Sequence, residues 1–530
     1  DDDEDDDDVF DVFDGGRRRR RRQKQRLKSS STSEEEGEEE HHHHHQQQPA
    51  VGVVLPVRGA SGRTTDNWRT QLNTTHDGDV SFVFVVEKDT DEAKREAERL
   101  ALELRRDEDK DEKGRRSARR RSARVVVSGS AEGCSQKIAQ QLRGVEELAG
   151  KKRVWVGRDV EEDVTKNDER GVGSASAEKH RRRPRRSRTN NKSPERNGRV
   201  KYVLFLDDDV MLYPSTIGSL VRAMEKDEEE TGGNALLATG YPLDFVGGGV
   251  DGGDVESSSS CFANYMTMVY HLVLLIPFSH GKYTKNVWGG CMFFRLDDFQ
   301  ANACKVKESY ENGGYSDDLI VAAAANREKR SILCPGDALF PLPLDPKQTV
   351  GHFVNYFHRQ IFVNDTYSDR RMKCINHGML LAMFLSSLCL TCGTVSSAID
   401  VALWLRSLAT SSQKYTTRTP TLAFAVFFAH FLAVTRAKKM YASCVSLCER
   451  TADAAIQRTA AAASCGQTPD AGRVARAGFN RTNWFKVWLA LCVVYAAAPV
   501  LCAHVVFFSN DVTWGGIRYR KCHGKVTRVL

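Results

Sequence analysis

The arginine-rich stretches of this 530-residue chain contain no aromatic residues. Two such stretches lie at 107–122 and 157–198, and a run of six arginines precedes them at 17–22. Proteins that bind single-stranded nucleic acid interleave aromatic side chains with basic ones, because bases stack on the rings. Without these rings no nucleic-acid partner is expected. We interpret the two longer stretches as disordered surface insertions, whose charge can also attract anionic lipid or an import receptor.

The first 50 residues lack the apolar side chains that a packed segment needs. They consist mainly of runs of aspartate, arginine, glutamate, histidine and glutamine. Such a composition cannot bury enough apolar surface to offset the entropy lost on ordering, so we predict a disordered tail at 1–50. Five histidines at 41–45 offer metal ligands, but low complexity explains them better. Because the chain begins at Asp1 rather than at methionine, we expect that a preceding piece, with a signal or a first membrane span, is missing.

The 14 cysteines show no recognisable disulfide framework. Cys389 and Cys392 form a C-x-x-C pair, but they lie in an apolar run with no other cysteine or histidine ligand nearby. This context favours packing over zinc binding or redox chemistry. The cysteines therefore give no indication of an oxidising compartment.

Long apolar runs are confined to the last third of the chain. The runs at 378–405 and 484–508 are long enough to cross a bilayer, and the run at 421–434 is short for a span. We therefore predict an integral membrane protein with two to four helical segments in 366–530. The basic segment 369–373 precedes the first run and places the preceding domain in the cytosol by the positive-inside rule. A second basic segment at 518–521 on the same side would require an even number of crossings.

Strand-like and helix-like segments alternate between residues 51 and 365. Their composition predicts strands at 51–59, 123–129 and 200–209, a strand, acidic turn and helix over 80–106, and helices at 134–148 and 318–330. This order predicts an α/β domain with a mostly parallel sheet.

Three consecutive aspartates follow the apolar run 203–206. Open α/β sheets bind ligands at the carboxyl ends of such strands. In an extended segment Asp207 and Asp209 would share a face and Asp208 would point away. Carboxylates on one face can hold Mg²⁺ or Mn²⁺ and leave positions for water and diphosphate oxygens. We predict a metal site at Asp207 and Asp209; a solvated acidic turn is the alternative.

Eight motifs occur in the order seen in ceramide glucosyltransferases, and they resemble the plant branch of that family most. They are "VVLPVRG", "FVVEKDTDEA", "CSQKI", "YVLFLDDDV", "ATGYPLD", "VWGGCMFFRLDDF", "GGYSDDLIVAA" and "VNYFHRQIFVNDTY". The resemblance covers residues 51–377 and the tail 511–520. It implies a GT-A nucleotide-sugar transferase domain followed by C-terminal transmembrane helices. It also implies transfer of glucose from UDP-glucose to the primary hydroxyl of ceramide, with inversion, at the cytosolic face of an ER or Golgi membrane.

The resemblance also implies which residues bind the nucleotide sugar. They are Glu87, Asp89, Asp91, Lys137, Asp207, Gly289 and Gly290. The register of the acidic turn stays open, since Lys88 stands where an acid is expected and any of the three acids can serve. Lys137 could instead lie on an exposed helix face. The two glycines would allow close backbone approach to a sugar or phosphate, or they could form a β-bulge.

Three further residues carry the reaction in this interpretation. By resemblance, Asp318 is the base that takes the acceptor's proton and Asp317 is its neighbour, although aspartate is also favoured as a helix N-cap. Arg359 matches the arginine of a Q/R-x-x-R-W signature and would clamp the diphosphate. Tyr356 and Gln360 depart from the two ends of that signature.

Other functions remain open at this stage. A related transferase could use another lipid acceptor, such as a sterol or a polyprenyl phosphate. Processive polysaccharide synthesis would favour an intact Q-x-x-R-W signature. A non-catalytic membrane scaffold could use the basic tracts to bind lipid, but it would have no reason to retain the acids and the arginine together.

Overall fold

The computed structural model describes residues 48–112, 120–150, 199–246, 261–279, 281–410, 421–459, 476 and 478–529. The predicted tail up to residue 47, its histidine run and the insertion at 157–198 lie outside these ranges. The second predicted insertion, at 107–122, is described in part. Helix α3 (Glu92–Glu112) continues through its first six residues, and β3 begins at Arg121, so only 113–119 lie outside the described residues.

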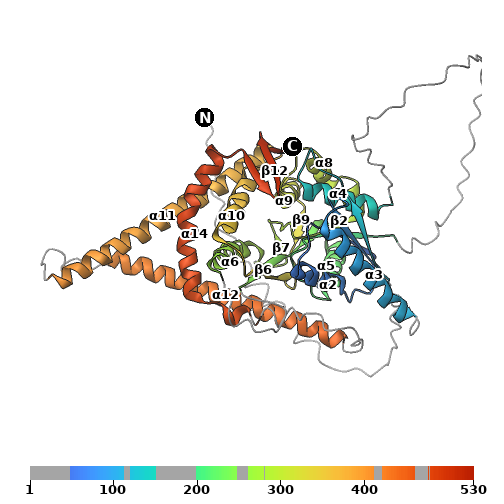
Figure 1. The fold of residues 1–530 in the computed structure, drawn as a ribbon, viewed down its shortest axis with the longest axis horizontal. Coiled ribbons are helices and arrows are strands. Elements are labelled where there is room, and N and C mark those ends of the chain that lie inside the picture. The colour runs from blue at the N-terminus through green and yellow to red at the C-terminus, as the bar shows by residue number, and fades with distance from the viewer. Residues whose placement is uncertain are drawn as a thin grey trace, which may run out of the picture. The chain divides into compact units, whose positions relative to one another are not determined.

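An eight-stranded sheet forms the centre of the domain, in the order β3-β2-β1-β4-β8-β5-β9-β7 (Figure 1). All strands except β8 and β7 run in one direction. The predicted α/β class with a mostly parallel sheet is therefore confirmed. The strands are β1 (Val51–Pro56), β2 (Val80–Val86), β3 (Arg121–Val127), β4 (Tyr202–Leu206), β5 (Ala235–Thr239), β7 (Tyr283–Thr284), β8 (Cys291–Arg295) and β9 (Ser331–Leu333).

Helices cover both faces of this sheet because its central strands are apolar on both sides. Along β1, Val53 and Leu55 contribute to one core and Val54 to the other. The first core includes α2 (Gly62–Leu72), α3 and α5 (Thr216–Thr231). The second includes α4 (Gln136–Leu148), α7 (Leu296–Gln300), α8 (Val306–Glu311) and α9 (Asp317–Arg327). The loops that follow the central strands meet between these layers and form the site described below.

A smaller parallel pair of strands lies beside the large sheet. It consists of β6 (Tyr241–Phe245) and β10 (Leu339–Pro343). Helices α6 (Phe262–Leu275) and α10 (Val350–Asn364) contribute to the same apolar core as these strands. This core continues into the C-terminal helices.

Three long helices follow α10. They are α11 (Arg370–Ala409), α12 (Thr421–Thr459) and α14 (Trp484–Phe507). Within the described residues, α11 and α14 are long and apolar enough to cross a membrane, as the sequence predicts. The most apolar window of α11 is only 11% buried, unlike the core helix of a water-soluble protein. The apolar run at 421–434 begins a 39-residue helix that continues through basic residues and packs against α11 and α14.

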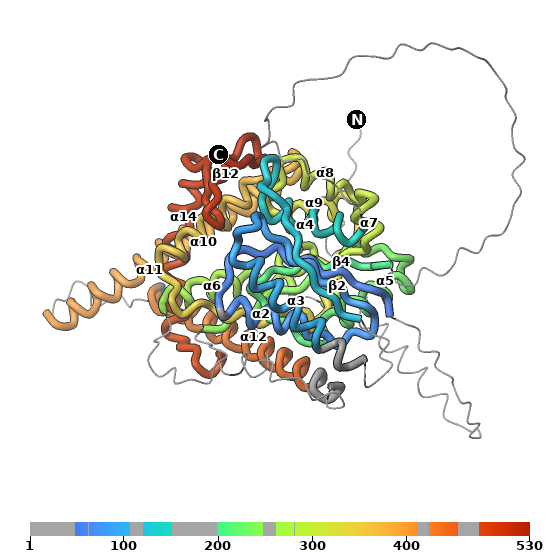
Figure 2. The backbone as a smooth tube through the Cα atoms, turned by 45° about the vertical axis from the view of Figure 1, so that its right-hand side comes forward, coloured from blue at the N-terminus to red at the C-terminus, as the bar shows by residue number. Residues whose placement is uncertain are grey.

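The last strands return to the α/β domain. β11 (Asp511–Trp514), β12 (Ile517–Cys522) and β13 (Lys525–Val529) form an antiparallel sheet next to α10 and α4 (Figure 2). The amide of Val526 donates to the carbonyl oxygen of Gly313 at 3.1 Å. The amide of Tyr367 donates to the carbonyl oxygen of Gly524 at 2.9 Å. The domain boundary predicted at 365 therefore does not separate residues 511–529 from the preceding domain.

Candidate active site

Lys137 contacts three other predicted site residues. Its helix, α4, begins with Ser135 as N-cap and points its first turn at the carboxyl ends of the strands. The Lys137 ammonium lies 2.7 Å from Asp207 Oδ1, 3.0 Å from Asp317 Oδ2 and 3.1 Å from the Gly289 carbonyl oxygen. The Lys137 side chain is only 15% exposed, so it does not lie on an exposed helix face. The segment after β4, the turn before β8 and the first turn of α9 thus converge on one ammonium group from α4.

The charges around Lys137 do not balance. Burial opposes a charge on Lys137, but Asp207 and Asp317 outweigh that effect and raise the pKa of the ammonium. The pKa of Asp207 is also raised, because withdrawal from water and repulsion by Asp317 exceed the attraction of Lys137. One lysine therefore serves two carboxylates, and the cluster retains a net negative charge that favours a further cation.

The alternation predicted for the three aspartates does not extend to them. Strand β4 ends at Leu206, and Asp208 and Asp209 form a turn, so their side chains do not follow the two-residue period of a strand. The buried Gln71 side chain fixes this turn, since its amide donates to the carbonyls of Asp207 and Val210, each at 2.9 Å. Withdrawal from water and its two charged neighbours raise the pKa of the half-buried Asp208. Asp209 has an exposed side chain, yet partial withdrawal from water and the charge of Asp207 raise its pKa to about 6.

The donor set at this turn fits a hard divalent cation. Asp207 and Asp209 supply carboxylate oxygens that are partly or fully accessible, next to excess negative charge. In the part of the chain that the structure describes, no group of three histidine, cysteine or acidic side chains could hold a metal ion. Protein ligands would therefore fill only part of a coordination shell, and water or phosphate oxygens would complete it.

Gly289 and Gly290 lie in the turn before β8, and the register of β8 with β4 is regular. No β-bulge therefore accounts for them. A Cβ atom at Gly289 would lie 2.8 Å from Asp317 Oδ1 and 3.2 Å from the Lys137 ammonium. A Cβ atom at Gly290 would lie 2.1 Å from the Trp288 ring. The absence of a side chain at Gly289 leaves room for Asp317 and Lys137, and the absence of one at Gly290 leaves room for the Trp288 ring.

Asp317 and Asp318 have different surroundings at the start of α9. The helix N-cap is Ser316, whose hydroxyl accepts from the Leu319 amide, so neither aspartate is the cap. Asp317 is buried and accepts from Lys137 and, at 2.7 Å, from the Gln141 side chain. Asp318 is half-buried, and burial together with Asp317 raises its pKa. Asp318 accepts from the Ser316 hydroxyl and, at 2.8 Å, from the Leu319 amide through Oδ1 alone, whereas both oxygens of Asp317 accept hydrogen bonds.

The three acids after β2 take three different roles. Glu87 is buried and accepts from Arg528 at 2.9 Å and from Ser130 at 3.0 Å. Burial would raise the pKa of Glu87, but these two donors outweigh it and the pKa is lowered. Asp89 is exposed and pairs with Lys94, and Asp91 accepts from the Gly59 and Ala93 amides at the start of α3. Only Glu87 is enclosed by the domain, and the C-terminal strand β13 binds it.

Arg359 is held by two aromatic rings. Its guanidinium carbon lies 5.4 Å from the centre of the Tyr356 ring and 5.0 Å from that of Trp514. Within the described ranges its guanidinium makes no hydrogen bond or ion pair to another residue, and its charge acts on the pKa of Asp207. Gln360 stands where the signature has tryptophan, and Trp514 of the C-terminal sheet supplies an indole instead. The arginine is therefore oriented but available for an anion.

Several residues of the site escape sequence reasoning. Tyr270 of α6 is close enough to Asp318 for that carboxylate to raise its pKa, and burial raises it further. The apolar segment 262–275 carries no motif that would identify this tyrosine. The tail motif at 511–520 includes Trp514, but no local pattern links it to Arg359.

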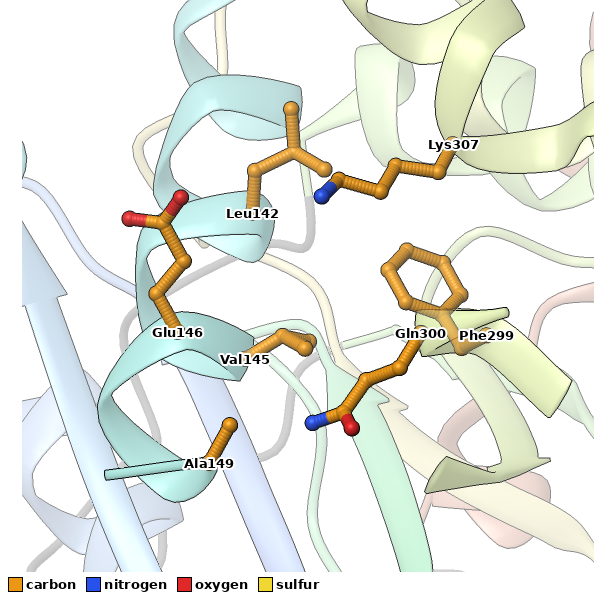
Figure 3. Close-up of a pocket in the computed structure, with 7 residues that line it drawn as sticks. All are labelled: Leu142, Val145, Glu146, Ala149, Phe299, Gln300 and Lys307. Carbon is orange, nitrogen blue, oxygen red and sulfur yellow. The ribbon is translucent and has the colours of Figure 1, made fainter. Parts of the chain in front are cut away.

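The two cavities described here lie away from the charged cluster. One, of about 90 Å³, lies between α4 and the α7–α8 region (Figure 3). It is lined by Leu142, Val145, Glu146, Ala149, Phe299, Gln300 and Lys307. The other, of about 590 Å³, lies at the sheet edge near β7 and β9 and includes Ile276, Tyr283 and Ser331. Neither contains a predicted site residue.

No protein-family model and no curated protein matches this chain. Solved structures that match include the mannosyltransferase PcManGT from Pyrobaculum calidifontis in complex with GDP-Man and Mn²⁺, at 12% identity and a TM-score of 0.30, covering 87% of this chain and 88% of that one. S. aureus TarS 1–349 matches at 10% identity and a TM-score of 0.28, covering 90% and 98%. Glucosyl-3-phosphoglycerate synthase from Mycobacterium tuberculosis, in complex with Mn²⁺ and UDP-glucose, matches at 11% and 0.24, covering 59% and 78%. Similarity at this level carries no conclusion about activity, so the function is inferred from the site itself.

Proposed function

We propose that the chain is a membrane-bound inverting glycosyltransferase of the GT-A type that transfers glucose from UDP-glucose to the primary hydroxyl of ceramide. The observation that carries this proposal is the cluster of Lys137, Asp207 and Asp317, with Asp318 and Arg359 beside it. A cation site, an anion clamp and a carboxylate with a raised pKa are the parts that sugar transfer from a nucleotide requires. The choice of glucose and of ceramide rests on the eight ordered motifs.

The donor side of the reaction falls to Asp207, Asp209 and Arg359. The two aspartates would hold Mg²⁺ or Mn²⁺, which when bound offsets negative charge that develops on the departing UDP. Arg359, oriented by two rings and without a protein anion of its own, would bind the diphosphate. Glu87 lies where the uridine is expected, although Arg528 now occupies its carboxylate.

Asp318 is the base in this proposal. Its carboxylate takes the proton from the acceptor hydroxyl as that oxygen attacks the anomeric carbon, opposite the bond to UDP, which inverts the configuration. The raised pKa of Asp318 favours acceptance of the proton. Asp317 is a poorer candidate, because Lys137 and Gln141 already engage its carboxylate.

The lipid acceptor is supported by the apolar helices. Both α11 and α14 could cross a bilayer by length and composition. The chain enters α11 directly from the domain and returns to the domain in β11 after α14, which agrees with an even number of crossings. We infer a multi-pass protein of the Golgi or ER membrane with its catalytic domain in the cytosol.

The test is a transfer assay on membranes that contain the full chain. Labelled UDP-glucose is offered with ceramide, a sterol or a polyprenyl phosphate, with Mn²⁺ or with a chelator. We expect β-glucosylceramide as the product, and its loss with the chelator. If glucose were transferred only to a sterol or a polyprenyl phosphate, that lipid would replace ceramide as the proposed acceptor. If the protein bound UDP but transferred glucose to none of the lipids, a non-catalytic role would be favoured.

A further inference from the structure

A half-buried histidine connects the smaller sheet to the helix that carries Arg359. His271 lies on α6, between Asp244 of β6 and Tyr356 of α10. Its Nδ1 lies 2.7 Å from Asp244 Oδ2, and its Nε2 is hydrogen-bonded to the Tyr356 hydroxyl. Neither the donor site nor the base described above uses Asp244 or His271.

One tautomer of His271 is compatible with its hydrogen bonds to both Asp244 and Tyr356. The Asp244 side chain is only 1% exposed, and a buried carboxylate accepts hydrogen bonds, so Nδ1 of His271 carries a proton. With Nδ1–H donating to Asp244, the tautomer in which Nε2 accepts from the Tyr356 hydroxyl satisfies both hydrogen bonds. Burial raises the pKa of Tyr356, which keeps this hydroxyl protonated.

Further hydrogen bonds fix the backbones of Asp244 and His271. The Asp244 carbonyl accepts from the Tyr441 hydroxyl of α12 at 2.7 Å, and β6 pairs with β10 at this residue. The His271 carbonyl accepts from the Tyr241 hydroxyl at 3.1 Å. The imidazole therefore has a fixed position from which to orient the phenol of Tyr356.

Tyr356 is the point of contact with the site. Its ring stacks against the Arg359 guanidinium on the same helix, and it packs edge-on against Tyr270 at a centroid distance of 6.0 Å. A swing of the Tyr356 side chain about χ1 would displace the ring against which Arg359 rests. The hydrogen bond of the hydroxyl to His271 restrains this displacement.

We propose that Asp244, His271 and Tyr356 form a positioning relay that holds Arg359 in the geometry that binds the donor's diphosphate. This inference rests on the proposed function. Asp244 and His271 act only through Tyr356, so their effect on donor binding must depend on the presence of the arginine.

A double-mutant cycle tests this dependence. His271→Gln keeps a donor for Asp244 but breaks the link to Tyr356, and Tyr356→Phe breaks the same link while it keeps the ring. Each is made in the full-length protein and in an Arg359→Ala background. The readouts are the Kd of UDP with Mn²⁺ and of inorganic pyrophosphate, by calorimetry, and kcat/KM for UDP-glucose.

We expect each variant to weaken UDP and pyrophosphate binding about tenfold in the full-length protein and less than about twofold without Arg359. His377→Gln is the matched control, since His377 bonds to Asp365 at 2.8 Å without a tyrosine–arginine contact on its other nitrogen. It should leave both Kd values unchanged.

Equal losses in both backgrounds, or no loss, would overturn the relay. A general folding defect would produce the former, because it would not depend on Arg359. Failure of the proposed function is a separate result: the unmodified protein would then bind UDP no better than the Arg359→Ala protein and would transfer no glucose.

Discussion

Arg528, from the last strand of the chain, binds the carboxylate of Glu87 at the end of β2, 441 positions earlier in the sequence. Because the donors on Glu87 lower its pKa, the folded protein binds this proton less readily than the unfolded chain does. The carboxylate therefore contributes stability above the unfolded pKa of about 4.3, and this contribution is lost as the pH falls through the lower folded pKa.

We predict that acidification destabilises the wild type more than a Glu87→Gln variant. Unfolding of both proteins is followed in detergent by near-ultraviolet circular dichroism between pH 7 and pH 3. The stability difference between them should shrink toward low pH. A difference that grows on acidification would mean that Glu87 does not gain its stability from the ionised form.

Lys137→Met should destabilise the protein in the absence of divalent cations. The substitution leaves Asp207 and Asp317 without their shared ammonium, and loss of one partner from a buried ion pair costs about 3 kcal/mol. Urea unfolding measures this loss, and added Mn²⁺ should recover part of it. Lys94→Met is the control, because its partner Asp89 is exposed and solvent screens this pair, so its loss should change the stability little.

Asp318→Asn should reduce the chemical step about 10²–10⁴-fold while UDP-glucose still binds. Asp317→Asn should reduce turnover less, but it should destabilise the Lys137 cluster, since that carboxylate binds the lysine and Gln141. Single-turnover rates and UDP-glucose titrations separate these effects. If Asp317→Asn were the inactive variant and Asp318→Asn the mild one, the two roles would have to be exchanged.

Asp209→Asn should abolish transfer and leave the fold intact. Asp209 is exposed, so its loss removes a cation ligand without disturbing a packed core. Mn²⁺ titration and turnover of the purified variant are the measurements. Near-normal turnover would exclude a metal role for this carboxylate.

Gly289→Ala should lower kcat/KM for UDP-glucose at least about tenfold, because the new methyl group would press on Asp317 and Lys137. Gly336→Ala provides the control, since no atom lies within 4 Å of the added Cβ there. Equal activities of the two variants would show that the charged cluster tolerates displacement.

Local sequence patterns predict much of this architecture. The apolar run before Asp207 identifies β4, and the following aspartates mark the edge of the sheet where the site lies. The motif around Lys137 predicts a lysine near the nucleotide, and in the structure that lysine contacts Asp207. Gly289 is predicted to allow close approach to a sugar or phosphate; in the structure its missing side chain leaves space next to Lys137 and Asp317.

Other features depend on contacts that no local pattern encodes. The alternation of a strand could not reveal that β4 stops before Asp208, because Gln71 from another helix fixes the turn. The pairing of Trp514 with Arg359, and that of His271 with Tyr356, joins segments that are distant in sequence. A single sequence does not predict such long-range contacts unless both residues belong to known motifs.

The return of the C-terminal sheet to the domain has a consequence for biosynthesis. A ribosome completes residues 48–365 well before it reaches Trp514 and Arg528, and both apolar helices are made in between. Until the last strand emerges, Glu87 lacks Arg528 and Arg359 lacks the indole. Assembly of the candidate site thus waits for the last strand, and a nascent chain that has not finished translation lacks the complete candidate site.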